Sequence, residues 1–269
     1  MRLLSICQCF FLLSLSFLTR YYAYSEYVSK LDDILANGVN SAVYPGVAAM
    51  AGTISGSFYS GVFGSYKFED EGIDEDDDIE NQKIDIDSIF DLASVSKVVA
   101  GTSAVAVLYE RGYLDIYTRV ADILGPDFIQ GGKENVTVQH CLLHNAGFNP
   151  DPDPWYWDSD FGCPNTDQPY PEEDFSCLDK IYTSFLAEEL VTPPGEAFKY
   201  SDLSFITLSM VVGTIVQKNE LVDTSKLAPL CKENKSYMAS VLCSYEAFVR
   251  LNVFHMQVIY VLTEILYAK

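Results

Sequence analysis

The stretch Phe90-Asp91-Leu92-Ala93-Ser94-Val95-Ser96-Lys97 carries the pattern that decides the fold. Residues 94–111 predict a helix, and Ser94 and Lys97 lie three positions apart at its start. Residues at i and i+3 share one face of a helix, so this hydroxyl and this amine can come within hydrogen-bond reach. The helix is apolar almost all round, which predicts central burial and favours the neutral amine, because desolvation disfavours charge. Ser94 and Lys97 are therefore a candidate nucleophile and general base.

The spacing of this pair is also typical of an ordinary helix start. A serine at the N-cap followed by a solvent-exposed lysine gives the same letters. A second stretch helps to distinguish the two interpretations: Tyr200-Ser201-Asp202 follows a Pro-Gly loop and precedes a predicted helix over 202–218. A phenol at such a place can share a proton with a nucleophile or a leaving group. The alternative is an ordinary loop tyrosine, in a chain that has 18 of them.

With these motifs, the chain resembles the superfamily of β-lactamases and penicillin-binding proteins, in its esterase-like and class C-like branch. Order and spacing agree across roughly residues 31–212. The matching stretches are Phe90–Lys97, Leu108-Tyr109-Glu110-Arg111-Gly112-Tyr113-Leu114-Asp115, Leu142-Leu143-His144-Asn145-Ala146-Gly147, Pro194-Gly195 and Tyr200-Ser201-Asp202-Leu203.

This resemblance implies an α+β fold in which a helical subdomain packs with an antiparallel sheet. It also implies a serine hydrolase that acts on an ester, amide or lactam through an acyl-enzyme on Ser94. Lys97 would be the general base and Tyr200 a proton-transfer partner, with no cofactor. Asp202, a substrate-binding position, stands where many members have asparagine, and a carboxylate cannot donate an amide N–H. The resemblance places His144 in a structural turn.

One family motif is absent from the sequence. No Lys-x-Gly or His-x-Gly triplet follows Tyr200, so we expect the C-terminal strands of the sheet, with their second oxyanion donor, to be missing. The sequence then predicts an incomplete, truncated domain over 24–254 and a divergent tail over 255–269. Three interpretations stay open: a truncated secreted hydrolase, an inactive binding protein on the same scaffold, or a membrane-anchored interaction protein.

The N-terminus predicts an exported protein, and export would change the interpretation of the cysteines. Residues 1–23 resemble a signal peptide, with a signal anchor as the alternative. Export to the outside or to the lumen of the secretory pathway would permit two local disulfides and N-linked glycans. The disulfide candidates are Cys163 with Cys177 and Cys231 with Cys243, the sequons are at Asn135 and Asn234, and Cys141 is expected as a buried free thiol.

Charge narrows the range of partners. The formal net charge of −21 argues against a nucleic-acid partner and against an anionic membrane surface. The resemblance implies a small-molecule or peptide acyl substrate. An insertion at 68–82 is strongly acidic, but its spacing is not that of a calcium loop. His140 and His144 lack the glutamate of a zinc helix, so no metal is expected. The remaining predicted elements are helices over 26–40, 117–124, 137–144 and 179–190, and a hairpin of strands over 47–53 and 58–66.

Overall fold

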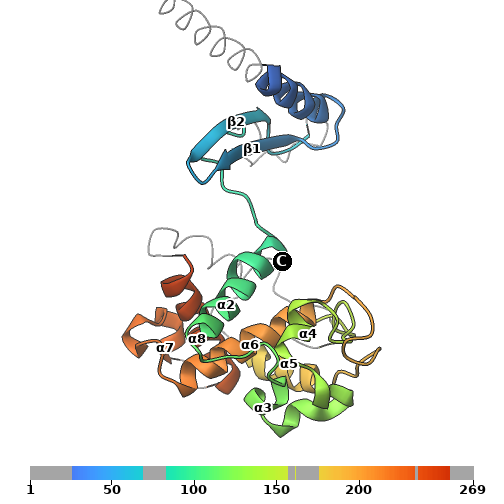
Figure 1. Ribbon diagram of the computed structural model, residues 1–269, viewed down its shortest axis with the longest axis vertical. Coiled ribbons are helices and arrows are strands. Elements are labelled where there is room, and N and C mark those ends of the chain that lie inside the picture. Colours follow the sequence, from blue (N-terminus) through green and yellow to red (C-terminus); the bar gives the residue numbers. More distant parts are fainter. Residues whose placement is uncertain (1–25, 69–82, 157–160, 162–175, 234–235, 255–269) are drawn as a thin grey trace, which may run out of the picture. The chain divides into compact units, whose positions relative to one another are not determined.

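The computed structural model divides the chain into two compact units that meet between Phe90 and Asp91 (Figure 1). It describes residues 26–68, 83–156, 161, 176–233 and 236–254. The predictions of a signal peptide, an acidic insertion and a divergent tail concern residues almost wholly outside this set. Cys163 of the predicted Cys163–Cys177 disulfide and Asn234 of the second sequon also lie outside it.

The first unit contains a helix followed by an antiparallel hairpin. Residues 26–40 are helical, as predicted. Strand β1 (Gly46–Thr53) pairs with β2 (Gly56–Gly64), with a register shift after Ala51. The hydroxyl of Tyr59 on β2 donates a hydrogen bond of 2.8 Å to Asp32. This bond ties the hairpin to the helix, because the phenol is buried and needs a partner.

The second unit is helical, and the predicted helices are present with shifted ends. The helix expected over 94–111 begins at residue 95 and includes a wide π-type turn. The helix expected over 202–218 has the predicted ends. The elements in chain order are η1 (Lys97–Thr102), α2 (Ser103–Glu110), α3 (Val120–Leu124), η2 (Pro126–Asn135), α4 (Val138–Leu142), α5 (Ser176–Ala187), α6 (Asp202–Lys218), η3 (Thr224–Lys226), α7 (Pro229–Glu233) and α8 (Tyr237–Asn252).

Helix α6 is the centre of this unit, and α2, α3, α4 and α8 pack around it (Figure 1). Its sequence is apolar on nearly every side, which is typical of a helix surrounded by others. Leu203, Leu208 and Val211 have no exposed surface. At Gly213 the missing side chain allows close approach of α8, because a Cβ there would lie 2.2 Å from the carbonyl oxygen of Val241.

The expectation that the helix after Ser94 is buried on all sides is wrong. Ala104 and Leu108 are fully buried, but Val95 is 53% exposed and Val98 is 61% exposed. Among the described residues of this unit, α6 and α8 pack against this helix and leave Val95 and Val98 uncovered. An apolar sequence shows that a helix can be buried, and the neighbouring elements decide which side is.

A buried lysine joins two parts of the helical unit. Lys133 in η2 has no exposed surface. Its amine donates to the carbonyl oxygen of Leu186, at 3.0 Å, and to that of Glu188. Burial lowers the pKa of Lys133 to about 8, because the interior disfavours the charged form. Two carbonyl groups at the C-terminal end of α5, those of Leu186 and Glu188, are thereby satisfied by a buried donor.

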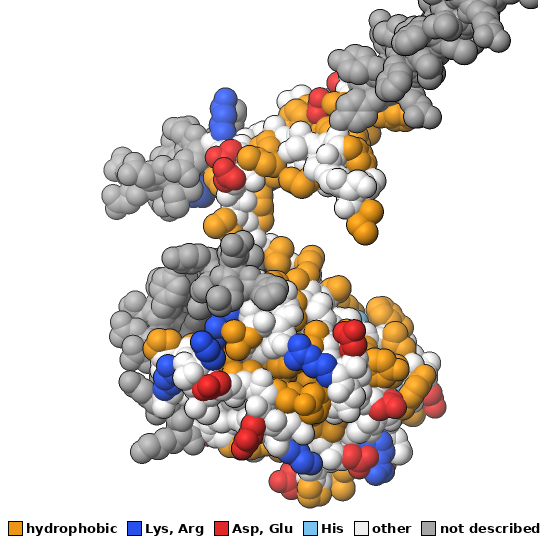
Figure 2. Space-filling view, turned by 60° about the vertical axis from the view of Figure 1, so that its left-hand side comes forward, with side chains coloured by type: hydrophobic (Ala, Val, Ile, Leu, Met, Phe, Trp, Pro, Cys, Tyr) orange, Lys and Arg blue, Asp and Glu red, His pale blue; other side chains and the backbone are white. Residues whose placement is uncertain are grey.

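The remaining fold-level predictions concern the sheet, the cysteines and the membrane. Among the described residues the sheet has two strands, which with the helices gives the expected α+β class. A disulfide joins Cys231 in α7 to Cys243 in α8, and Cys141 is a buried free thiol. In the described part of the chain, each helix is too short or too polar to cross a bilayer. Basic and acidic side chains are interspersed on the face of the helical unit shown in Figure 2.

Candidate active site

A tight turn presents Ser94 at the start of its helix. The carboxylate of Asp91 accepts a hydrogen bond of 2.7 Å from the backbone N–H of Ala93. Ala93 has φ of +43°, a left-handed conformation that a residue with a Cβ adopts only at a cost. Backbone strain of this kind is concentrated at functional sites, where surrounding structure maintains it. Ser94 follows directly and is exposed.

Lys97 lies one helical turn further along, on the same face. Its amine donates a hydrogen bond of 3.0 Å to the hydroxyl oxygen of Ser94. The Lys97 side chain is 17% exposed, so the amine is largely removed from water. The structure therefore brings the predicted nucleophile and the predicted base together at the distance that the i and i+3 spacing indicates.

Asp202 completes the surroundings of the amine. Its carboxylate forms an ion pair of 2.9 Å with Lys97. Asp202 is the first residue of α6, where the positive end of the helix dipole favours a negative charge. Sequence analysis assigned Asp202 to substrate binding and missed this ion pair. The signal that could have indicated it was the replacement of the family's asparagine by a residue that carries a charge.

The expectation of a neutral Lys97 amine is wrong for the free protein. Desolvation is the largest single influence and lowers the pKa of Lys97. The hydrogen bonds and charges of Tyr200 and Asp202 act in the opposite direction and together outweigh it, so the pKa is raised above its ordinary value. The resting amine is an ammonium ion.

His144 positions the Tyr200 segment. Its ring lies 4.4 Å from the ring of Tyr200, centroid to centroid, and its Nδ1 accepts a hydrogen bond of 3.1 Å from the N–H of Ser201. Burial, then the nearby charge of Lys97, lowers the pKa of His144 and preserves the neutral imidazole that can accept this bond. The structural role that the resemblance implied for His144 thus includes direct contact with the candidate site.

The loop after α4 fixes the two residues that follow Tyr200. Ser201 is 1% exposed, and its hydroxyl donates to the carbonyl oxygen of Asn149 at 2.6 Å. The backbone N–H of Asp202 donates to the carbonyl oxygen of Pro150 at 2.8 Å. Tyr200 remains partly exposed, and its ring centroid lies 5.2 Å from the Lys97 amine. Three separate segments of the chain therefore determine the geometry around that amine.

A cavity of about 440 Å³ opens beside Ser94, Lys97 and Asp202. Its wall is formed by η1, α6 and α8 and is mainly apolar. Burial raises the pKa of one wall residue, Tyr245, to about 12. Other side chains of the wall belong to Phe205, Ile206, Glu246 and Val249.

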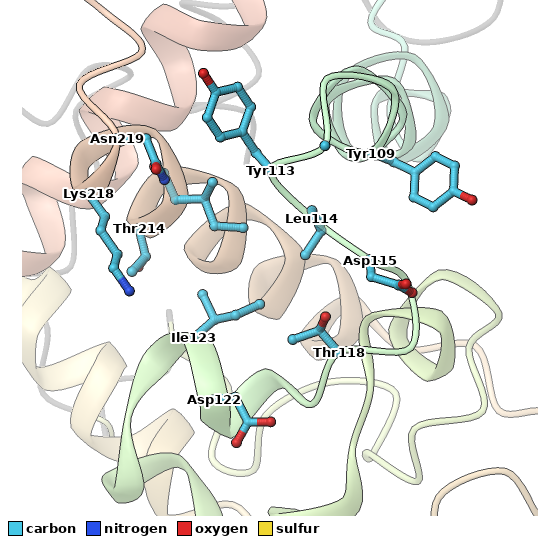
Figure 3. A pocket seen from close by; sticks show the side chains of 12 residues that line it. Tyr109, Tyr113, Leu114, Asp115, Thr118, Asp122, Ile123, Thr214, Lys218 and Asn219 are labelled. Atoms are coloured by element: carbon cyan, nitrogen blue, oxygen red, sulfur yellow. The ribbon is translucent and has the colours of Figure 1, made fainter.

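A larger cavity, of about 520 Å³, lies elsewhere in the helical unit. Figure 3 shows that its side chains come from the turn after α2, from α3 and from the end of α6. It contains Asp115, whose carboxylate accepts a hydrogen bond of 2.9 Å from the N–H of Tyr117. None of the predicted catalytic residues lines it, so the smaller cavity is the candidate active site.

The other predicted sites have structural surroundings of their own. His140 forms a capping box with Thr137 at the start of α4. In the described part of the chain, no three His, Cys, Asp or Glu side chains gather as metal ligands would. Asn135 is exposed at the end of η2, where a glycan has room.

Comparisons with known proteins connect this geometry to a family. No curated protein matches the chain. A candidate β-lactamase from Bacteroides dorei DSM 17855 is 18% identical, with a TM-score of 0.50, over 83% of this chain and 62% of that one. The octameric penicillin-binding protein homologue from Pyrococcus abyssi is 18% identical, also with a TM-score of 0.50, over 71% of this chain and 39% of that one.

These similarities establish the fold, which is of the β-lactamase and transpeptidase type. The chain spans less than two thirds of the length of either structure. The family model for β-lactamases matches residues 31–222, which is more than half of the chain and includes Lys97 together with Ser94, Tyr200 and Asp202. The chain therefore belongs to the β-lactamase family, within the superfamily of serine hydrolases related to penicillin-binding proteins.

Proposed function

We propose that the protein is a serine hydrolase that cleaves an ester, amide or lactam through an acyl-enzyme on Ser94. One observation carries the proposal: the Lys97 amine lies 3.0 Å from the Ser94 hydroxyl oxygen at the mouth of a cavity. Family membership supports it, since that pair occupies the S-x-x-K motif of such enzymes. The strained turn at Ala93, which exposes Ser94, supports it as well.

The proposed reaction proceeds in two halves. Neutral Lys97 accepts the hydroxyl proton of Ser94 while Oγ bonds to the carbonyl carbon of the substrate. The bond to the leaving group then breaks, Tyr200 gives its proton to that group, and the Lys97 ammonium reprotonates Tyr200. Water attacks the acyl-enzyme in the second half, and its proton returns to Ser94 through the same two side chains.

A fluorophosphonate probe tests this proposal, because it reacts with activated serine hydroxyls. We expect an adduct on Ser94, located by peptide mass spectrometry, that is absent in Ser94→Ala. Lys97→Ala should label more slowly by a factor on the order of 10²–10⁴, which is the usual contribution of a positioned base. Ser103→Ala is the matched control, because Ser103 lies on the same helix and its hydroxyl donates to the carbonyl oxygen of Val98. Folded protein without an adduct would refute the proposal.

We also propose that the protein enters the secretory pathway. The leader-like sequence of residues 1–23 supports this location. The disulfide between Cys231 and Cys243 supports it too, because such bonds persist in oxidising compartments. Asn135, the first residue of a sequon, is exposed and accessible to a glycosyltransferase.

A further inference from the structure

The charges around the candidate active site do not favour an anionic ligand. Lys97 is the one cation among the described residues that line the cavity, and three carboxylates line it as well. The charge of Lys97 is compensated by Asp202 at 2.9 Å. Glu246 pairs with Arg250 at 2.6 Å, which leaves the exposed Asp91 without a cation in this region. The two cations and three carboxylates together carry a formal charge of −1; they are Lys97, Arg250, Asp91, Asp202 and Glu246.

We propose that Asp202 determines specificity, and that the substrate is an apolar acyl ester or amide with no carboxylate beside the scissile bond. This inference rests on the proposed function, since it concerns the same Ser94. A substrate carboxylate near Ser94 would meet Asp202 and find the nearest cation already paired. Like charges at close range disfavour binding, which is how a site rejects one substrate class while it accepts another.

The position of Asp202 allows this selection. Its side chain is 38% exposed, so it faces the cavity as well as the amine of Lys97. An uncharged amide at this position would leave the Lys97 ammonium uncompensated and attractive to an anion. The replacement therefore changes the local charge by one unit with little change of shape.

The cavity wall indicates the rest of the substrate class. Phe205 and Ile206 from α6 and Tyr245 and Val249 from α8 form its apolar part. Such a surface gains free energy when it covers an apolar group, and it offers little to a strongly hydrated one. An aromatic or aliphatic acyl group without a negative charge fits both the wall and the charges.

A matched pair of esters tests the inference. The N-phenylacetylglycyl ester of 3-hydroxybenzoic acid carries a carboxylate on its leaving group, and the methyl ester of the same compound does not. We expect the wild-type protein to hydrolyse the methyl ester with the higher kcat/KM. In Asp202→Asn, the ratio of the two kcat/KM values should fall by about tenfold, which corresponds to about 1.4 kcal/mol. The ratio cancels any common change in the basicity of Lys97.

The control variant, Asp115→Asn, also removes one negative charge. Asp115 lines the larger cavity (Figure 3), and the amide oxygen of asparagine can still accept the hydrogen bond from the N–H of Tyr117. The ratio should stay at the wild-type value in this variant. In the wild-type protein, the ratio of kcat/KM for the methyl ester to kcat/KM for the free carboxylate should fall toward one as the salt concentration is raised, because salt screens exposed charges.

The possible failures are distinguishable. A wild-type preference for the free carboxylate, or a ratio unchanged in Asp202→Asn, would overturn the inference while the hydrolase proposal stands. If Asp202→Asn does not fold, the wild-type preference and its salt dependence decide. Labelling of Ser94 that neither ester slows by competition would show the substrate class to be wrong. Folded protein with neither turnover nor a Ser94 adduct would refute the hydrolase proposal itself.

Discussion

The amine of Lys97 donates a hydrogen bond to the hydroxyl oxygen of Ser94 and pairs with the carboxylate of Asp202, beside the ring of Tyr200. The negative charge of Asp202 stabilises the ammonium form, and this attraction is lost when the amine is neutral. The resting site is therefore stable in its protonated form, and the proton must leave before Lys97 can act as a base.

The pH dependence of acylation follows from this arrangement. Because the pKa of Lys97 is raised, the neutral amine forms only at alkaline pH, and the rate should still increase with pH at pH 9. Asp202→Asn removes one of the groups that raise the pKa of Lys97. The pH profile of this variant should therefore move to lower pH. At a fixed pH below both pKa values, lowering the pKa of Lys97 by one gives about tenfold more neutral amine.

The measurement is the rate of labelling of Ser94 by an uncharged fluorophosphonate between pH 7 and pH 10. Asp115→Asn, which lies in the other cavity, should reproduce the wild-type profile. Superimposable profiles for wild type and Asp202→Asn would contradict the assignment of Asp202 as the group that holds the proton on Lys97.

The sequence predicts which residues form the candidate site better than it predicts their ion pairs and protonation. Ser94 and Lys97 are one helical turn apart, so their proximity follows from local geometry. The ion pair with Asp202 joins residues more than a hundred positions apart, and only the packing of α6 creates it. The direction of the Lys97 pKa depends on opposing influences of burial and charge, which no local pattern can balance.

Helices α6 and α8 cross at a point where no side chain fits. Gly213 faces the carbonyl oxygen of Val241, and a Cβ would come within 2.2 Å of it. A Cβ at Gly101, by contrast, would lie 2.9 Å from the ring of Phe205, which is a side chain rather than backbone. The two glycines therefore differ in how easily their neighbours can move.

Gly213→Ala should destabilise the protein despite the better helix propensity of alanine. Alanine gains about 1 kcal/mol as a helix former. Overpacking against a fixed backbone costs roughly 1–3 kcal/mol, and here α8 itself must move. We expect a net loss in the free energy of unfolding, measured by urea denaturation, and a smaller loss in Gly101→Ala. A Gly213→Ala protein as stable as wild type would contradict the close crossing.

Among the elements, α6 could be predicted with its ends, and the helix after Ser94 could be predicted only in part. Helix α6 follows a loop rich in proline and is apolar over its length, so pattern and packing agree. The side of the earlier helix that carries Val98 is apolar and exposed. Periodicity identifies an apolar surface, but it contains no information about which neighbour covers it.

The whole molecule combines a strongly acidic chain with features of an exported protein. The net charge of −21 is consistent with the scarcity of cations around the cavity. One disulfide closes a short loop between α7 and α8. The position of Lys133 could not be predicted from composition. A lysine is expected at the surface, but this one is fully buried and donates to two carbonyl groups.

Expression in a secreting eukaryotic cell tests the proposed export. We expect an N-linked glycan on Asn135, detected as a mobility shift that peptide N-glycosidase removes. Asn135→Gln should lose that glycan, and Asn135→Gln/Asn234→Gln should carry no N-linked glycan. Asn40→Gln is the control, because Asn40 is exposed but lies outside a sequon. Unglycosylated protein whose Cys231 and Cys243 react with iodoacetamide before reduction would contradict export.

Three consecutive residues around the start of α6 lie in three different surroundings. Tyr200 stacks on His144, Ser201 is buried against the Asn149 carbonyl, and Asp202 returns to the Lys97 amine. A single-residue deletion before this triplet would place the Asp202 carboxylate in the buried position, and a single-residue insertion would place Ser201 beside the base. The loop from Pro193 must therefore keep its length for the Asp202 carboxylate to reach the Lys97 amine.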